Sequence, residues 1–318
     1  MNKLINAVKN TILRYKTILV AYLIGIILYI TCVIVIPGFG IGSHFKVLVL
    51  EICILGILSL GQTLVIISGG IDLSIAGNLT CTAVLFTYLS GGKNGNVWFI
   101  ILIVLIVSSA AGLINGLGIA YFKIPPLIMT LGMNSVLIGF VLVLLGGQTG
   151  GYSPPILSQT IMGSNRGIPG AAIIFIIITI FITFLLSKTT IGRKLYFVGS
   201  NENIADFSGI KSKNIKVLTY ILGGLFTGIG GIILVGRLGQ SYLGMGDSYT
   251  FPTVIAVVLG GASIMGGSGN FLGTIAGTII FIMLKGFLSA LGLTLPIQQI
   301  INGFILVVAV ILMPRSKR

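Results

Sequence analysis

Two acidic residues of this sequence have the right type and position for ion chemistry in an apolar environment. Only five Asp and Glu residues occur among 318, and Glu51 and Asp72 are the two that fall in or beside long apolar stretches. Acids at such positions bind or carry the protons and sodium ions that drive secondary transport. Glu51 lies five residues from Lys46, near the end of its stretch, which favours a solvated or snorkelling position.

Asp72 stands between a glycine pair, Gly69-Gly70, and the next apolar stretch, which begins at Leu73-Ser74. A carboxylate at this position can cap a helix by accepting hydrogen bonds from free backbone N–H groups. It can also face a polar pathway, and the two roles are compatible. An ion-coupled secondary transporter that works through Asp72 or Glu51 is therefore one hypothesis. The scarcity of buried charge favours an uncharged substrate.

Motifs of nucleotide hydrolysis and metal-dependent catalysis are absent from the sequence. No GxxxxGK[ST] loop occurs, and GGKN at 91–94 lacks both the spacing and the hydroxyl that hold phosphate and magnesium. His44 is the sole histidine, so no HExxH pair can form. The cysteines Cys32, Cys53 and Cys81 lie in apolar stretches without a CxxC spacing, as buried structural cysteines do. We expect neither catalysis nor a metal site in this chain.

The composition indicates that lipid solvates most of the elements that position these residues. The chain is 55% hydrophobic and 8% charged, with a mean hydropathy of +1.14, whereas a soluble domain carries about 25% charged residues. Its 46 glycines suit close packing of helices in a bilayer.

We predict a single all-α, polytopic membrane domain over residues 1–318. Apolar runs of spanning length predict ten membrane spans near residues 18–36, 46–68, 72–90, 97–120, 127–146, 171–187, 214–236, 252–265, 270–289 and 297–313. The first of these is too long for the apolar core of a signal peptide and predicts an uncleaved span.

The basic residues predict the orientation of the spans. With the N-terminus inside, the inner segments hold fourteen Lys and Arg residues and the outer segments hold four, namely Lys46, Lys93, Arg166 and Arg237. This bias obeys the positive-inside rule and predicts that both termini are cytoplasmic. The chain has a net charge of +14, but its basic residues border apolar spans and do not form a stripe on a soluble domain. This distribution argues against nucleic-acid binding.

A faint internal repeat marks two corresponding places in the chain. VIISGGIDLSIAGN at 65–78 and AVVLGGASIMGGSGN at 256–270 each contain a β-branched run, a Gly-Gly break and a small polar stretch. Both breaks follow a span that runs inward. Glycine interruptions at matching places point to a transport pathway, although two unrelated glycine-rich turns would give the same pattern.

The most polar part of the chain, residues 189–216, is predicted to be a cytoplasmic loop with a short helix. Asn201 is a good N-cap, and Gly209 followed by Ile210 is a good C-terminal stop. A helix of about two turns is unstable alone in water. Ile204 and Phe207 share one face of it, so the helix either folds back on the bundle or docks in a groove of another protein.

This loop resembles a known family. The pattern T-x-x-G-R-x-x-Y-x-x-G-x-N-x-x-x-A-x-x-S-G-I, which begins at Thr189 and ends at Ile210, is similar to the coupling loop of ribose/galactose/xylose-type permeases, the membrane subunits of bacterial ABC sugar importers. Three further stretches match the same family in the same order, at 61–77, 125–139 and 255–277. The resemblance covers nearly the whole chain after the first span.

The resemblance implies a permease of the bacterial cytoplasmic membrane that pairs with itself or with a sister subunit. A separate ATPase, which binds the ATP and Mg, would dock on the cytoplasmic loop, and an extracytoplasmic binding protein would deliver a monosaccharide or similar small polyol. The residues implied in ATPase coupling are Gly192, Arg193, Gly199, Asn201, Glu202, Ile204, Ala205, Asp206, Phe207, Ser208, Gly209 and Ile210.

The resemblance also implies a substrate pathway lined by polar groups and the two glycine breaks. The candidates are Gln62, Gly69, Gly70, Asp72, Ser74, Asn78, Thr130, Asn134, Gln148, Gly260 and Gly261. Their amides, hydroxyls and carboxylate can pair with sugar hydroxyls; the alternative for each polar side chain is a hydrogen bond between helices, which contributes about 0.6 kcal/mol in a membrane. The segment before the second break departs from the family at Tyr249, Phe251, Pro252 and Val257, which leaves the identity of the sugar open.

Overall fold

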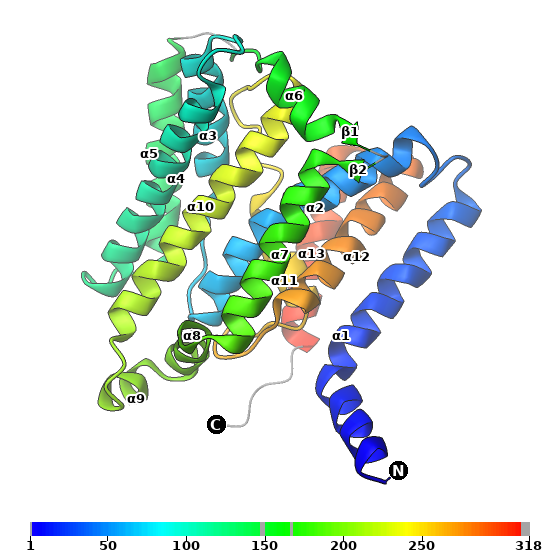
Figure 1. Ribbon diagram of the computed structural model, residues 1–318, viewed down its shortest axis with the longest axis vertical. Coiled ribbons are helices and arrows are strands. Elements are labelled where there is room, and N and C mark those ends of the chain that lie inside the picture. The colour runs from blue at the N-terminus through cyan, green and yellow to red at the C-terminus, as the bar shows by residue number, and fades with distance from the viewer. Residues whose placement is uncertain (1, 147–149, 166–167, 313–318) are drawn as a thin grey trace.

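The computed structural model describes residues 2–146, 150–165 and 168–312 (Figure 1). Of the residues discussed above, Gln148 and Arg166 lie outside this range. The helices are α1 (Asn2–Val35), α2 (Ser43–Ile67), α3 (Ile75–Ser90), α4 (Val97–Ala120), α5 (Pro126–Leu145), α6 (Pro155–Met162), α7 (Gly170–Lys188), α8 (Thr190–Ser200), α9 (Glu202–Phe207), α10 (Ser212–Leu238), α11 (Thr250–Leu259), α12 (Phe271–Ala290) and α13 (Leu295–Leu312). Two-residue strands β1 (Ser164–Asn165) and β2 (Ile168–Pro169) form an antiparallel pair. The all-α prediction is confirmed.

Each of the ten predicted spans contains a helix. Seven helices are long and apolar enough to cross a membrane by length and composition, and three shorter apolar helices cover Ile75–Ser90, Thr250–Leu259 and Leu295–Val308. The predicted span 252–265 was too long, because α11 ends before Gly260-Gly261. At 1.5 Å per residue, α11 extends about 15 Å, half the thickness of the hydrocarbon core.

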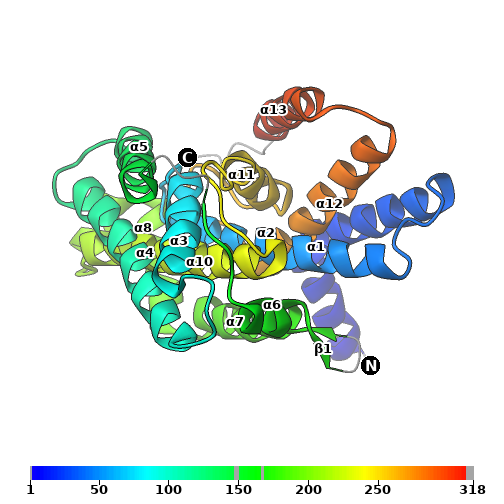
Figure 2. The same ribbon diagram turned by 90° about the horizontal axis from the view of Figure 1, so that it is seen from above.

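Helices α2 and α10 form the centre of the bundle, and α3, α4, α11 and α12 pack around them (Figure 2). Small residues permit this packing. A Cβ on Gly112 of α4 would lie 2.1 Å from the carbonyl oxygen of Tyr220 on α10, and a Cβ on Gly224 would lie 2.4 Å from that of Ser108. The glycines thus allow backbone-to-backbone contact between α4 and α10, as the composition predicted.

The outer faces of the bundle remain apolar. Trp98, Phe99 and Ile106 on α4 and Ile177 and Ile180 on α7 are all exposed. Large apolar side chains in this number need lipid as their solvent, which makes the chain a multi-pass membrane protein. Helices α8 and α9 lie at the end of the bundle where α1 begins (Figure 1), in agreement with the predicted placement of the loop and the N-terminus on one side.

Candidate functional site

The predicted loop 189–216 contains two helices, of which only α9 was expected. Helix α8 begins directly after α7, and the Thr189 hydroxyl accepts a 3.3 Å hydrogen bond from the backbone N–H of Gly192. Gly192, Leu195 and Val198 are buried. Their spacing of three residues is a helical signal that the surrounding polar residues obscured.

Helix α9 begins and ends at the predicted residues. The side chain of Asn201 accepts a 3.1 Å hydrogen bond from the N–H of Ile204. At the other end, Gly209 has φ +79°, and the N–H of Ile210 donates to the carbonyl oxygen of Ala205 at 3.0 Å. This is the Schellman stop, which a residue with free access to positive φ favours.

An exposed apolar pair lies on α9. Phe207 is 92% exposed and Ile204 is 53% exposed, whereas Ala205 between them is buried. Phe207 is therefore turned away from the bundle, so the fold of this chain does not bury it, and docking in another protein stays a prediction. Beside α9, a hollow of about 320 Å³ is lined by Arg193, Phe197 and neighbouring residues of α8 and the loop after α9.

The two acids of α9 bind the start of α10. Glu202 forms an ion pair with Lys216, and the carboxylate of Asp206 accepts a 3.1 Å hydrogen bond from the N–H of Ser212. The hydrogen bonds from Ser212, together with nearby Lys213 and Lys216, lower the pKa of Asp206 from its ordinary value. Charged contacts thus tie α9 to α10.

The C-terminal end of α8 lies directly against the ends of two membrane segments. A Cβ on Gly199 would lie 1.7 Å from the carbonyl oxygen of Ile67, the last residue of α2, and 2.7 Å from the backbone nitrogen of Gly267. The N–H of Gly267 donates to that same Ile67 oxygen at 2.9 Å. The hydroxyl of Tyr196 donates to the carbonyl oxygen of Gly269 at 2.7 Å. Both repeat segments of the sequence therefore meet at α8.

The two glycine breaks end their helices in the same way. After α2, the N–H of Gly70 donates to Val65 and Gly69 has φ +83°; after α11, the N–H of Ala262 donates to Val257 and Gly261 has φ +85°. Each is a Schellman stop. The positive-φ glycine is the first of its pair in one break and the second in the other, so the motif is offset by one residue from the sequence repeat.

Asp72 lies in a buried network at the start of α3. Its carboxylate accepts hydrogen bonds from the backbone N–H of Ser74 at 2.8 Å and from the Ser74 hydroxyl at 2.6 Å. The amide of Asn115 on α4 donates to the Ser74 hydroxyl oxygen at 2.9 Å. Ser74 itself occupies the N-cap position of α3, without a side-chain cap hydrogen bond, so Asp72 binds the N-cap residue and does not itself cap the helix.

Three other pathway candidates are bonded between helices. Thr130 and Asn134 on α5 accept hydrogen bonds from the backbone N–H groups of Leu73 and Gly77, at 3.1 and 2.7 Å. Asn78 contacts Ser108 of α4 through both atoms of its amide. These contacts agree with the helix-packing alternative and fix α3 against α4 and α5.

Gln62 differs from these residues. It is 1% exposed, and neither side-chain atom has a hydrogen-bond partner among the described residues. A buried carboxamide without partners is costly, so Gln62 is not explained by hydrogen bonds between the described helices, unlike the other polar candidates.

Glu51, expected to be solvated or snorkelling, also has two ion-pair partners that the sequence did not indicate. Its carboxylate is 3.0 Å from a guanidinium nitrogen of Arg237 and 3.4 Å from the ammonium nitrogen of Lys285, and its side chain is 22% exposed. The cluster joins α2, α10 and α12 at the end of the bundle opposite α8. Sequence reasoning missed it because the partners are 186 and 234 positions away.

The bundle thus combines membrane-spanning helices with a half-length helix, α11, and an exposed apolar pair on α9. Residues 45–310 match the family model described as branched-chain amino acid transport system / permease component. The chain belongs to this family, whose members are transport components of the cytoplasmic membrane.

Curated relatives cover most of the chain. It is 35% identical to the ribose import permease protein RbsC of Bacillus subtilis (strain 168) over 290 residues, 90% of this chain and 89% of the relative. It is 32% identical to the autoinducer 2 import system permease protein LsrD of Yersinia enterocolitica over 267 residues, 82% of this chain and 80% of the relative. The LsrD protein of Escherichia coli (strain K12) is 33% identical over the same length. No solved structure matches the chain.

Proposed function

We propose that this chain is the transmembrane subunit of an ATP-binding cassette importer for a monosaccharide, ribose-like, or a similar small polyol. The names of the relatives, a ribose permease and autoinducer 2 permeases, support the substrate class. A free amino acid would bring two formal charges into the pathway. The membrane acids described here are already engaged, Glu51 by two cations and Asp72 by Ser74, which favours an uncharged substrate.

The observation that carries the proposal is the contact of α8 with both glycine breaks. In the proposed mechanism a separate ATPase holds Phe207 and Ile204 of α9 in a groove. Closure of the ATPase on ATP moves α8 and α9 together. Gly199 transmits this movement to the end of α2, and Tyr196 transmits it to the segment before α12. ATP acts by binding the closed arrangement more tightly than the open one.

The remaining coupling residues have distinct roles in this proposal. Gly192 lets α8 turn back against α7, since a Cβ there would lie 2.3 Å from the carbonyl oxygen of Leu186. Glu202, Asp206 and Ser208 hold the shape of α9 through the contacts with α10 and a hydroxyl bond to Ile204. Arg193 lies beside the hollow next to α9, where the ATPase would contact it.

The proposal assigns the other parts of the importer to separate chains. ATP and Mg are bound by the ATPase, this chain binds no cofactor, and an extracytoplasmic binding protein delivers the sugar. The permease works as a dimer with itself or a sister subunit.

The first test is gentle purification of the tagged chain from its native membranes, followed by identification of the proteins that accompany it and an assay of ATP hydrolysis. We expect a stoichiometric ATPase, and ATP-dependent uptake of D-ribose after reconstitution into vesicles. A chain that arrives alone and catalyses uptake without ATP would overturn the proposal.

A further inference from the structure

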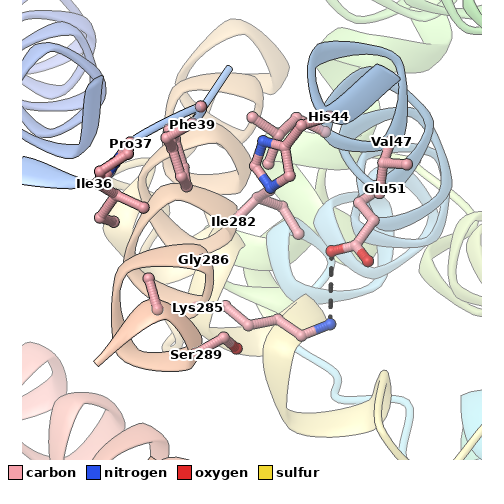
Figure 3. A pocket seen from close by; sticks show the side chains of 13 residues that line it. Ile36, Pro37, Phe39, His44, Val47, Glu51, Ile282, Lys285, Gly286 and Ser289 are labelled. Atoms are coloured by element: carbon pink, nitrogen blue, oxygen red, sulfur yellow. Dashed lines mark hydrogen bonds and ion pairs between the residues drawn. The ribbon is translucent and has the colours of Figure 1, made fainter. Parts of the chain in front are cut away.

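A cavity of about 570 Å³ lies between α2, α11, α12 and α13. Glu51 and Lys285 line it and also line a neighbouring pocket of about 390 Å³, which Figure 3 shows. In that view Lys285 reaches from α12 to the carboxylate of Glu51 on α2, and this ion pair belongs to the lining of both spaces. The larger cavity is of a size that suits a small molecule.

Helix α13 presents its polar residues to the larger cavity. Gln298, Gln299 and Asn302 line it, whereas Ile300 and Phe304 on the opposite side of the helix are 72% and 70% exposed. The amide of Gln298 donates to the hydroxyl oxygen of Ser289 at 3.1 Å and to the carbonyl oxygen of Leu293 at 2.8 Å. The amides of Gln299, which is exposed, and of Asn302, which is partly buried, have no hydrogen-bond partner among the described residues. Amides in a membrane helix face water or a polar partner and not hydrocarbon, so the cavity holds polar contents.

The charges around the cavity balance. Glu51 and Asp247 contribute two negative charges, and Lys285 together with Arg237, the second partner of Glu51, contributes two positive charges. A charged ligand would gain little from such a wall. Amides beside the aromatic rings of Tyr249 and Phe251 instead suit a neutral molecule with many hydroxyl groups.

The same face of α2 continues from the cavity to Gln62. Glu51 and Gln62 are eleven residues apart, about three helical turns, and therefore lie on one side of the helix. Leu55 lies on this side and lines the cavity. Gln62 supplies an independent observation, because its amide is buried without a partner among the described residues.

We propose that the cavity between α2, α11, α12 and α13 is a binding site for a neutral polyhydroxylated molecule and leads along α2 to Gln62. This inference rests on the proposed function and deepens it. It places the substrate beside α13, on the side of α2 away from the Asp72 network, with Gln299 and Asn302 as the hydroxyl-binding amides.

The test uses thiol labelling in the assembled importer. Cys32, Cys53 and Cys81 are replaced by Ala, and Asn302→Cys or its lipid-facing neighbour Phe304→Cys is added. Cells are treated with a negatively charged, membrane-impermeant methanethiosulfonate. We expect Asn302→Cys to react at least about ten-fold faster, because a thiol ionises in water and stays protonated in apolar surroundings. We also expect this modification to block D-ribose uptake, whereas treatment of Phe304→Cys leaves uptake unchanged.

Each contrary result has a separate meaning. Equal, slow labelling at both positions overturns the site, and so does fast labelling at Asn302→Cys that leaves D-ribose uptake intact. A disulfide between two copies at Asn302→Cys also overturns it, because a second permease would then occupy the cavity. Loss of ATP-dependent uptake before any labelling counts against the proposed function instead, and the labelling rates still decide whether the cavity is a polar space.

Discussion

The hydroxyl of Tyr196 on α8 donates a 2.7 Å hydrogen bond to the carbonyl oxygen of Gly269, the residue before the cap of α12. This bond connects the cytoplasmic helices to the second glycine-rich break. A net hydrogen bond contributes about 1 kcal/mol, which is a factor of about five in a conformational equilibrium. Loss of the Tyr196 hydroxyl should therefore shift the conformational equilibrium of the break without unfolding the protein.

We predict that Tyr196→Phe lowers sugar uptake per ATP hydrolysed by up to about five-fold, while the ATPase still co-purifies. Uptake and hydrolysis are measured on the same vesicles. Tyr88→Phe, an exposed tyrosine on α3, is the control and should behave as wild type. A parallel loss of ATPase binding and uptake in Tyr196→Phe would contradict a transmitting role.

Phe207→Asp should detach the ATPase and leave the permease folded. Because Phe207 is 92% exposed, the change costs the isolated chain little. Loss of a buried aromatic anchor weakens a complex by at least about 2 kcal/mol, roughly 30-fold in Kd. The measurement is co-purification of the ATPase, with the thermal melting curve of the permease alone.

Two comparison variants separate docking from folding. Phe207→Leu keeps an apolar anchor and should retain the ATPase, whereas Ala205→Asp places a charge at a fully buried position of α9 and should unfold the helix. Unchanged co-purification of Phe207→Asp would refute the docking assignment.

Gly199→Ala should disrupt the contact of α8 with the glycine breaks. The added Cβ would lie 1.7 Å from the carbonyl oxygen of Ile67, so α8 must move away from the end of α2. Overpacking of this kind costs about 1 to 3 kcal/mol. We expect a lower melting temperature and strongly reduced uptake.

The control for Gly199→Ala is Gly132→Ala on α5, where the added Cβ meets nothing within 4 Å. Replacement of a helical glycine by alanine without a clash stabilises by up to about 1 kcal/mol. Equal effects of the two substitutions on melting and uptake would show that α8 does not press on α2.

Local chemistry explains why much of this region could be predicted from the sequence. The caps of α9, Asn201 and Gly209, act within a few residues of their partners, and apolar runs alone indicated where the membrane helices lie. Helix α8 was missed because it follows α7 without a turn-forming residue, so its buried positions looked like part of a polar loop. The offset between the two breaks also depends on which glycine adopts positive φ, which the sequence repeat does not specify.

The contacts that assemble the candidate site come from residues far apart in the chain. Glu51 looked solvated beside Lys46, yet its partners are Arg237 and Lys285, and no local pattern connects the three. In the same way, α13 reads as an ordinary apolar span until the structure shows that Gln298, Gln299 and Asn302 share one face beside a cavity.

The junction of α9 and α10 should keep its structure from pH 8 to pH 5. Hydrogen bonds from Ser212 lower the pKa of Asp206 in the folded chain. A lowered carboxyl pKa adds stability that is fully present above the unfolded value of about 3.9 and is lost as the pH falls through the folded pKa. Hydrogen exchange of the α9 amides should therefore be constant over this range, after correction for the intrinsic rate. A transition near pH 6 would show that another group controls the junction.

Uptake should depend on ATP and not on the membrane acids. Glu51 is neutralised by Arg237 and Lys285, and Asp72 accepts two hydrogen bonds from Ser74, so neither is free to carry an ion. Vesicles that contain ATP should take up D-ribose equally well with and without a protonophore. Glu51→Gln leaves two cations facing each other and should lower the free energy of unfolding, by less than the about 3 to 5 kcal/mol of a fully buried pair. Thermal melting measures this loss, with Lys46→Gln as the control. In the double variant Glu51→Gln, Asp72→Asn, the amide oxygen of residue 72 still accepts a hydrogen bond, and ATP-driven uptake should persist at a reduced level. Complete loss of uptake in a folded double variant, together with sensitivity of the wild type to the protonophore, would establish ion coupling instead.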